Sequence, residues 1–264
     1  MTAAQYGKGW KPDLNEHIVQ TPVFGGLYAA QKLGAVRTPR EHTSLPDYCF
    51  VRDQDGSSAC VGFGLTGAAY CRLHAIGVPC GLFSPTALYN LTLMASRPNK
   101  SDPLIDDGCY PFVAASILVD HGLCQESAYP FSMKRVAKEV DLQTVLTSSQ
   151  FRVSNFSRIT ARGEERVEVC KRSIAASHPV PLGMLVGDEF QAYTSSRDPV
   201  GIETGPDTGG HMTFLCGYEN DGEVFIGCNS WGKSWGDQGF FRIHRSKLEH
   251  SSTTDLYEIV ITEK

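Results

Sequence analysis

The spacing of hydrophobic residues changes midway along the chain. After Cys60, the apolar positions Leu65, Ala69, Leu73 and Ile76 recur every three or four residues, which is typical of a helix with a buried face. Short apolar runs typical of strands follow residue 180. We expect helices over residues 60–76, 85–95, 111–122 and 164–177, and strands over residues 182–186, 212–217, 224–227, 239–243 and 256–262.

Turn and cap residues support several of these boundaries. Gly77 and Pro79 end the first helical pattern, because neither residue continues a helix well. Ser84 followed by Pro85 is a typical N-cap and first-turn pair, so a helix should begin there. The Asn220-Asp221-Gly222 cluster between two predicted strands indicates a hairpin turn.

The order of the predicted elements indicates an α+β chain. A helical lobe over about residues 46–150 should lie beside an antiparallel β lobe over about residues 151–264. The boundary between two such lobes forms a cleft, and binding sites are concentrated in clefts. The interpretation therefore places a functional site between the two lobes.

Residues 1–45 differ from the rest of the chain. They contain several prolines and few periodic apolar positions, which predicts an extended arm that packs on the body formed by residues 46–264. The arm should be held by large apolar side chains, since burying each one is worth roughly 1.5 to 3 kcal/mol. These side chains belong to Trp10, Leu14, Ile18, Val23, Phe24, Leu27 and Tyr28.

Composition and charge exclude some classes of protein. Hydrophobic residues make up 41% of the 264 residues and charged residues 20%, which is ordinary for a folded globular protein. The net charge of -5 and the lack of basic clusters argue against a nucleic-acid partner. No apolar run approaches the roughly 18 residues that span a bilayer, and the first residues do not resemble a secretory signal. We expect a cytoplasmic protein without a membrane partner, with delivery by a non-classical route as the alternative.

The nine cysteines allow two interpretations. Their odd number, without an export signal, favours free thiols in a reducing compartment. If one cysteine is a nucleophile, the other eight would allow an extracellular scaffold with up to four disulfides. A metal site is not expected, because no Cys-x-x-Cys pair occurs and the histidines lack zinc-ligand spacing from the thiols.

Three segments carry candidate chemistry. Cys60 opens a predicted helix, where unpaired backbone N–H groups should lower the pKa of a thiol and favour the nucleophilic thiolate. His211 precedes a predicted strand, and Asn229 and Trp231 follow the next strand of the hairpin, so the hairpin can bring them together. Taken singly, each residue also has a structural interpretation: a small core cysteine, a hydrogen-bonded histidine and an aromatic core loop.

Together, these residues resemble one family. Gln54, Cys60, His211 and the Asn229-Ser230-Trp231-Gly232 block have the order and spacing of the papain-like cysteine peptidases (peptidase C1), and the resemblance runs from about residue 46 to the C-terminus. Residues 189–193 resemble the family's strand and turn before the histidine, and residues 239–243 resemble the strand that closes the β lobe. The short N-terminal arm is similar to that of microbial members.

The resemblance implies a cysteine endopeptidase that needs no cofactor. Cys60 would attack the scissile carbonyl, and His211 would hold the thiolate and protonate the leaving amine. Asn229 would orient the His211 ring, and Trp231 would shield that contact from water. Gln54 would donate a hydrogen bond in the oxyanion hole. Protein or peptide substrates are the implied partners, with a proteinaceous inhibitor as a further one.

Some positions depart from the family pattern. The usual Cys-Gly-Ser-Cys-Trp around the nucleophile is replaced by Ser57-Ser58-Ala59-Cys60-Val61, which removes a disulfide partner. The glycine-rich cleft wall has no clear counterpart, and residues 79–83 or 106–109 could replace it. At the pocket for the side chain before the scissile residue, Met212 replaces a small residue and Gly183 a branched one. We expect this pocket to accept apolar side chains and reject charged ones.

Two alternatives to peptide hydrolysis remain open. The same nucleophile could serve an acyltransferase with an amine acceptor, since both reactions pass through an acyl-thioester. The fold could also be an inert binding scaffold, although such scaffolds usually lose the thiol or the histidine. The arm likewise has two interpretations: it completes the core, or it blocks the cleft.

Overall fold

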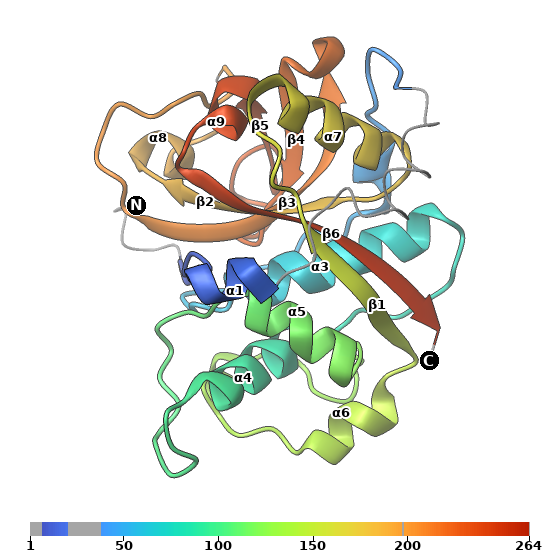
Figure 1. Cartoon of the computed structure of the whole chain (residues 1–264), viewed down its shortest axis with the longest axis vertical. Helices are drawn as coiled ribbons and strands as arrows, with labels where there is room; N and C mark the ends of the chain where they lie inside the picture. Colours follow the sequence, from blue (N-terminus) through green and yellow to red (C-terminus); the bar gives the residue numbers. More distant parts are fainter. Residues whose placement is uncertain (1–6, 21–37, 197, 264) are drawn as a thin grey trace.

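The computed structural model describes residues 7–20, 38–196 and 198–263, and it has a helical lobe below a sheet-containing lobe (Figure 1). Within the described residues, four helices build the lower lobe, and a short helix of the arm lies beside them. The four helices are α3 (Cys60–Ala75), α4 (Pro85–Ser96), α5 (Pro111–Asp120) and α6 (Leu142–Ser148). The helix of the arm is α1 (Asn15–Gln20). Two 3₁₀ turns also occur, η2 (Leu45–Tyr48) and η3 (Met133–Arg135).

The other lobe is built on a six-stranded sheet in which all neighbouring strands are antiparallel. The strand order is β1-β6-β2-β3-β4-β5, so the two longest strands, β3 and β6, flank β2. The strands are β1 (Phe151–Arg158), β2 (Val180–Val186), β3 (Gly209–Glu219), β4 (Val224–Cys228), β5 (Phe240–His244) and β6 (Thr253–Glu263); α7 (Gly163–Ala175), α8 (Asp188–Gln191), η4 (Asn220–Gly222) and α9 (Arg245–Glu249) join them.

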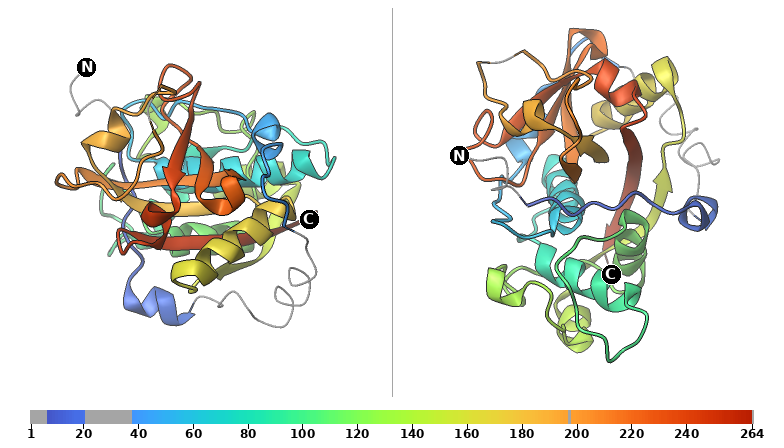
Figure 2. Two further views of the ribbon diagram at one scale, coloured as in Figure 1. Left: turned by 90° about the horizontal axis from the view of Figure 1, so that it is seen from above. Right: turned by 90° about the vertical axis from the view of Figure 1, so that its left-hand side faces the viewer.

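Helix α3 lies between the two lobes and contacts α4, α5 and β3 (Figures 1 and 2). Two glycines allow this close packing. A Cβ at Gly62 would lie 2.4 Å from the Pro85 carbonyl oxygen, and one at Gly64 would lie 3.2 Å from the Met212 side chain. The sequence of α3 therefore fixes Cys60, its first residue, against the start of β3.

The structure confirms the expected helices and strands to within a few residues. Ser84 caps α4, because its Oγ accepts a hydrogen bond from the Ala87 amide at 3.0 Å. The predicted turn joins β3 to β4, with Asn220 and Asp221 at φ of 49° and 57°. One expectation was wrong: residues 189–193 are not a strand and turn, since residues 188–191 form α8. The strand β1 and the helix α6 were not expected.

The nine cysteines are all free thiols in the structure. The sulfur atoms of Cys49 and Cys71 lie 3.2 Å apart in a hydrogen-bonding contact. Cys216 and Cys228 also contact the Cys49 thiol, and burial is the main cause that raises its pKa. Among the described helices, none is both long and apolar enough to span a membrane.

Candidate active site

The hairpin of β3 and β4 brings His211 and Asn229 together. Their side chains meet at 2.7 Å, between His211 Nε2 and Asn229 Oδ1. Because the amide oxygen also accepts the Ser230 backbone N–H at 2.8 Å, it acts as an acceptor, and Nε2 must carry the ring proton. His211 Nδ1 is then the basic nitrogen, and it is buried without a hydrogen-bond partner among the described residues.

Trp231 covers this contact. Its ring stacks on His211 with centroids 4.4 Å apart and planes 30° from parallel. Trp235 and Phe190 pack edge-on against Trp231, at 5.1 Å and 5.6 Å. Phe190 comes from α8, so this short helix completes an aromatic layer that keeps water from the His211–Asn229 hydrogen bond.

Cys60 occupies the expected place at the N-terminus of α3, but its environment differs from the expected one. Burial raises the pKa of the thiol to about 11, although backbone hydrogen bonds from Met212, Gly9, Val61 and Trp10 act in the opposite direction. The prediction of a lowered pKa was therefore wrong for this state of the protein. The helix terminus does favour the thiolate, but complete desolvation outweighs it.

The histidine is affected in the complementary way. Burial lowers the pKa of His211 to about 4, against the hydrogen bond to Asn229, and the positive charge of Lys8 lowers it further. At neutral pH, His211 is a neutral imidazole and Cys60 a neutral thiol. The reactive ion pair is not formed while both groups are buried.

Gln54 is held in a defined orientation beside this pair. Its Oε1 accepts the Ser230 hydroxyl at 2.6 Å, which directs Nε2 away from β4. Nε2 donates to the carbonyl oxygens of Ser57 at 2.7 Å and Gly7 at 3.1 Å. The side chain therefore presents an N–H donor to a peptide carbonyl near Cys60, as an oxyanion hole requires.

The N-terminal arm lies against these residues, since Gly9 and Trp10 contact Cys60 and Gly7 contacts Gln54. The arm crosses between the two lobes as an extended segment (Figure 2, right). Gly9 accepts a hydrogen bond from the Cys109 amide at 2.8 Å, and Lys11 donates one to the Cys109 carbonyl at 3.0 Å. On the opposite side, Trp10 donates to the Gly210 carbonyl at 3.2 Å. The arm thus occupies the cleft as a peptide would, with main-chain hydrogen bonds to both walls.

Side chains of the arm add further contacts. Lys8 Nζ donates to Thr208 Oγ1 at 2.8 Å, and Lys11 forms an ion pair with Asp107 at 3.0 Å. Of the apolar groups expected to anchor the arm, Trp10 is buried, whereas Leu14 is 43% exposed. The side chain of Ile18 and the residues Val23, Phe24, Leu27 and Tyr28 lie outside the part described in detail.

Comparison with known proteins agrees with this geometry. The family model of the papain family cysteine proteases matches residues 101–259, more than half of the chain. The chain belongs to this family. The matched segment contains His211 and Asn229, while Gln54 and Cys60 precede it.

Individual relatives are distant. The chain is 26% identical to mouse pro-cathepsin H over 204 residues (75% of this chain, 56% of the relative), and 25% identical to a probable cysteine protease, RD21C, of Arabidopsis thaliana over 247 residues (86% and 52%). It spans about half the length of the curated relatives it matches. The crystal structure of xylellain, a cysteine protease from Xylella fastidiosa, superposes with a TM-score of 0.74 and 18% identity, covering 96% of both chains. This likeness shows the papain fold with its helical and antiparallel β lobes.

The papain-type cleft wall is supplied by one of the two segments considered from the sequence. Residues 106–109 lie along the arm, and a Cβ at Gly108 would come within 2.1 Å of the Gly9 carbonyl oxygen. Residues 79–83 are placed elsewhere, since Phe83 pairs with Gln125 in a separate β-bridge. The cleft wall is therefore short and contains a single glycine at its closest approach.

The two residues proposed for the substrate pocket face each other across β2 and β3. Gly183 pairs with Met212 in the strand register, and Met212 is fully buried. Gly183 contacts the indole of Trp10, whereas Met212 lies against Gly64 of α3. The sequence did not identify Asp255, which is fully buried and accepts the Trp10 indole N–H at 2.9 Å. No local signal could have revealed it, because a single acidic residue near the start of a strand has no pattern of its own.

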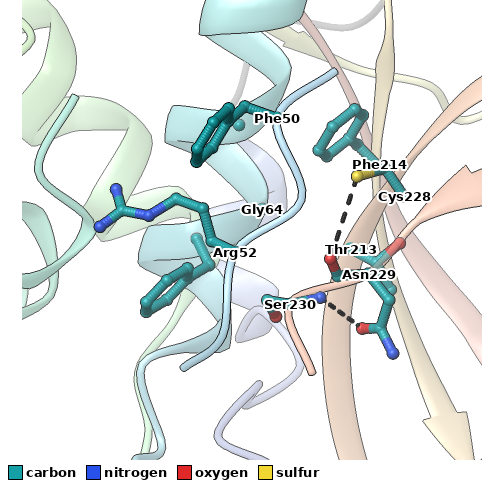
Figure 3. Close-up of a pocket in the computed structure, with 10 residues that line it drawn as sticks. Phe50, Arg52, Gly64, Thr213, Phe214, Cys228, Asn229 and Ser230 are labelled. Atoms are coloured by element: carbon teal, nitrogen blue, oxygen red, sulfur yellow. Dashed lines mark hydrogen bonds between the residues drawn. The ribbon is translucent and has the colours of Figure 1, made fainter. Parts of the chain in front are cut away.

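A small cavity is lined in part by Asn229 (Figure 3). Phe50, Arg52, Phe214 and Cys228 are among its lining residues, and its volume of about 20 Å³ is close to that of one water molecule. It is too small for a peptide side chain. Within the described ranges, no group of three or more His, Cys, Asp or Glu side chains could hold a metal ion.

Proposed function

We propose that the chain is a cysteine endopeptidase, a thiol hydrolase of the papain type, synthesised in a self-blocked form. The observation that carries this proposal is the 2.7 Å hydrogen bond between His211 and Asn229, which leaves a basic ring nitrogen on the strand that contacts Cys60. Membership in the papain family and the donor geometry of Gln54 support the same reaction.

The reaction follows from these positions. The Cys60 thiolate attacks the scissile carbonyl, the C–N bond breaks, and His211 gives its proton to the departing amine. Gln54 Nε2 donates to the carbonyl oxygen as negative charge develops there. Water, deprotonated by His211, then hydrolyses the Cys60 thioester and restores the thiol. Asn229 keeps the ring orientation through both steps.

The contacts of the arm with the site residues support the proposal of a self-blocked form. Its backbone amides at Gly9 and Trp10 donate toward the Cys60 sulfur, and its Gly7 carbonyl accepts the N–H groups of Gln54 and Trp231. A substrate cannot occupy these positions until the arm leaves. We therefore favour the blocking role of the arm, with protein or peptide substrates and a proteinaceous inhibitor as partners of the open cleft.

The nucleophile is tested with the full chain carrying Trp10→Ala, which weakens the docking of the arm. Peptide hydrolysis and labelling by an epoxide inhibitor of cysteine peptidases should both appear in this variant. Adding Cys60→Ser should abolish both. Cys80→Ser, at a half-buried thiol after α3, is the matched control and should leave both unchanged. Equal labelling of several cysteines, or hydrolysis that survives Cys60→Ser, would contradict the proposal.

The blocking role is tested by comparing the unaltered chain with Trp10→Ala and with a chain lacking residues 1–40. A blocking arm predicts faster hydrolysis in both variants. An arm that only completes the core predicts a lower melting temperature without a gain in activity. Adding an amine acceptor to the same reaction separates hydrolysis from acyl transfer, because transfer yields an amide product.

A further inference from the structure

The arm residue Trp10 occupies a pocket beside Cys60. The shape and polarity of this pocket suit a large, flat side chain that carries an N–H donor. The pocket, called here the indole pocket, is formed by Gly183 of β2, Gly210 of β3 and Asp255 of β6. Trp10 is 4% exposed there, and its backbone contacts the Cys60 sulfur. A side chain in this pocket therefore belongs to a peptide that lies across the nucleophile.

The two glycines determine what fits. A Cβ at Gly183 would lie 2.3 Å from Trp10 Nε1, and a Cβ at Gly210 would lie 2.5 Å from Trp10 Cε3. Real Cβ atoms do not approach other atoms so closely, so any larger residue at either position would displace the indole. The bare backbone on these strands leaves space for a large, flat side chain.

The base of the pocket adds a polar requirement. Asp255 Oδ2 accepts the Trp10 indole N–H at 2.9 Å and the Asp13 backbone N–H at 3.1 Å, and the carboxylate is fully buried. When the arm leaves, this oxygen loses both donors. A buried acceptor without a partner is costly, so an entering side chain that carries an N–H group is favoured over an aliphatic one.

The charge of Asp255 is already compensated. Arg158 Nη2 lies 2.6 Å from Asp255 Oδ1, and Arg158 is itself mostly buried. A lysine or arginine side chain of a substrate would bring a second positive charge close to Arg158. A neutral N–H donor avoids this repulsion, so the pocket should favour tryptophan over lysine and arginine.

We propose that the indole pocket selects substrates with tryptophan at the residue before the scissile residue, and that Asp255 determines this selection. The inference rests on the proposed peptidase function, but its geometry can be tested without hydrolysis. It refines the expectation of an apolar pocket that rejects charged side chains: the preferred side chain is large, aromatic and tipped with a neutral hydrogen-bond donor.

The first test measures binding. The full chain with Trp10→Ala and Cys60→Ala is titrated calorimetrically with the peptide Gly-Lys-Gly-Trp-Lys-Pro-Asp-Leu, which copies residues 7–14, and with analogues carrying 1-methyltryptophan, leucine or arginine at the tryptophan position. A hydrogen bond to a charged group predicts that N-methylation weakens binding roughly 10- to 100-fold. Equal binding of tryptophan and 1-methyltryptophan, or tighter binding of leucine or arginine, would overturn the proposal.

The second test measures hydrolysis by the full chain with Trp10→Ala, using peptides that differ only at the residue before the scissile residue. Tryptophan should give the highest kcat/KM, and adding Gly183→Val should reverse the order in favour of leucine. Gly205→Val is the matched control, because a Cβ there meets nothing within 4 Å, and it should keep the tryptophan preference. Preference for leucine or arginine before Gly183 is changed would refute the selection.

The two tests fail separately. If no peptide is hydrolysed but tryptophan binds at least tenfold more tightly than 1-methyltryptophan, the peptidase function is wrong and the indole pocket stands. If hydrolysis depends on Cys60 but shows no tryptophan preference, the function stands and the selection is wrong. A circular dichroism melt of each variant identifies misfolded protein, and the Gly183→Val comparison is made only between folded variants.

Discussion

The docking of the arm should depend on pH through Asp13. Its carboxyl group is buried between Asp255, Tyr257 and the backbone of α5, where it accepts the Phe112 amide at 3.0 Å. Burial, with the nearby Asp255 carboxylate, raises the pKa of Asp13 from 3.8 to about 7, against the Phe112 hydrogen bond and the charge of Arg158. The docked arm therefore binds a proton more tightly than the released arm.

The sign and size of the effect follow from this difference. Because the pKa of this carboxyl is higher in the docked state, its protonation stabilises docking. The contribution is complete at a pH below the pKa of the released state, and it is lost as the pH rises through the pKa of the docked state. Since a tenfold change in proton affinity corresponds to about 1.4 kcal/mol, the rise from 3.8 to about 7 amounts to up to roughly 4 kcal/mol. Docking should weaken between about pH 4 and pH 7, and the cleft should open toward neutral and alkaline pH.

Asp13→Asn isolates this effect, because the amide resembles the protonated carboxyl and does not titrate. The assay is the rate of Cys60 alkylation by iodoacetamide, measured by peptide mapping from pH 4 to pH 8. Dividing the rate of the unaltered chain by that of Asp13→Asn cancels the chemistry of the thiol itself. The ratio should rise with pH. Glu16→Gln, an exposed arm residue in α1, is the control and should follow the unaltered chain. A flat ratio for Asp13→Asn would refute the reasoning.

Three further predictions follow from the site and the core. Asn229→Ala should lower kcat by on the order of 100-fold with less effect on KM, since a misoriented His211 loses part of the contribution that general acid–base catalysis makes to the rate. Steady-state kinetics in the Trp10→Ala background measure this change. An unchanged kcat would contradict the orienting role of Asn229. Trp231→Ala should cost about 3 to 5 kcal/mol of stability, measured by urea unfolding, and a loss below 1 kcal/mol would mean that Trp231 is not a core residue. The intact mass should correspond to nine thiols, whereas a disulfide such as Cys49–Cys71 would lower the mass by two hydrogens and contradict this prediction.

The sequence predicted the elements whose boundaries have a local physical cause. Ser84 and Pro85 begin α4 because a hydroxyl acceptor and a fixed φ favour the first turn of a helix, and both residues are adjacent in the chain. The helix α6 begins at a comparable cap, because Asp141 accepts the amides of Gln143 and Thr144. The strand β1 was missed because its burial does not alternate regularly along residues 151–158, and its pairing with β6 shifts register between Val153 and Asn155.

The sequence carries more information on the placement of the proposed catalytic residues than on the substrate pocket. Cys60, His211 and Asn229 stand at helix and strand ends, so their chemistry could be read together with local structure. Asp255 instead acquires its role through Trp10, which is 245 positions away in the chain. A contact of this kind depends on the crossing of the arm and β6, and no local pattern encodes it.

The raised pKa of Cys60 and the lowered pKa of His211 have the same cause. Both shifts come mainly from burial, and both favour the neutral form of the side chain. When the arm leaves, water reaches the cleft and the cost of charging each group falls. The backbone N–H groups of Val61 and Met212, which belong to the body, then remain to stabilise the thiolate. In the proposed self-blocked form, the arm therefore blocks the enzyme twice: its backbone takes the place of a peptide, and burial of the site keeps the proton on the nucleophile.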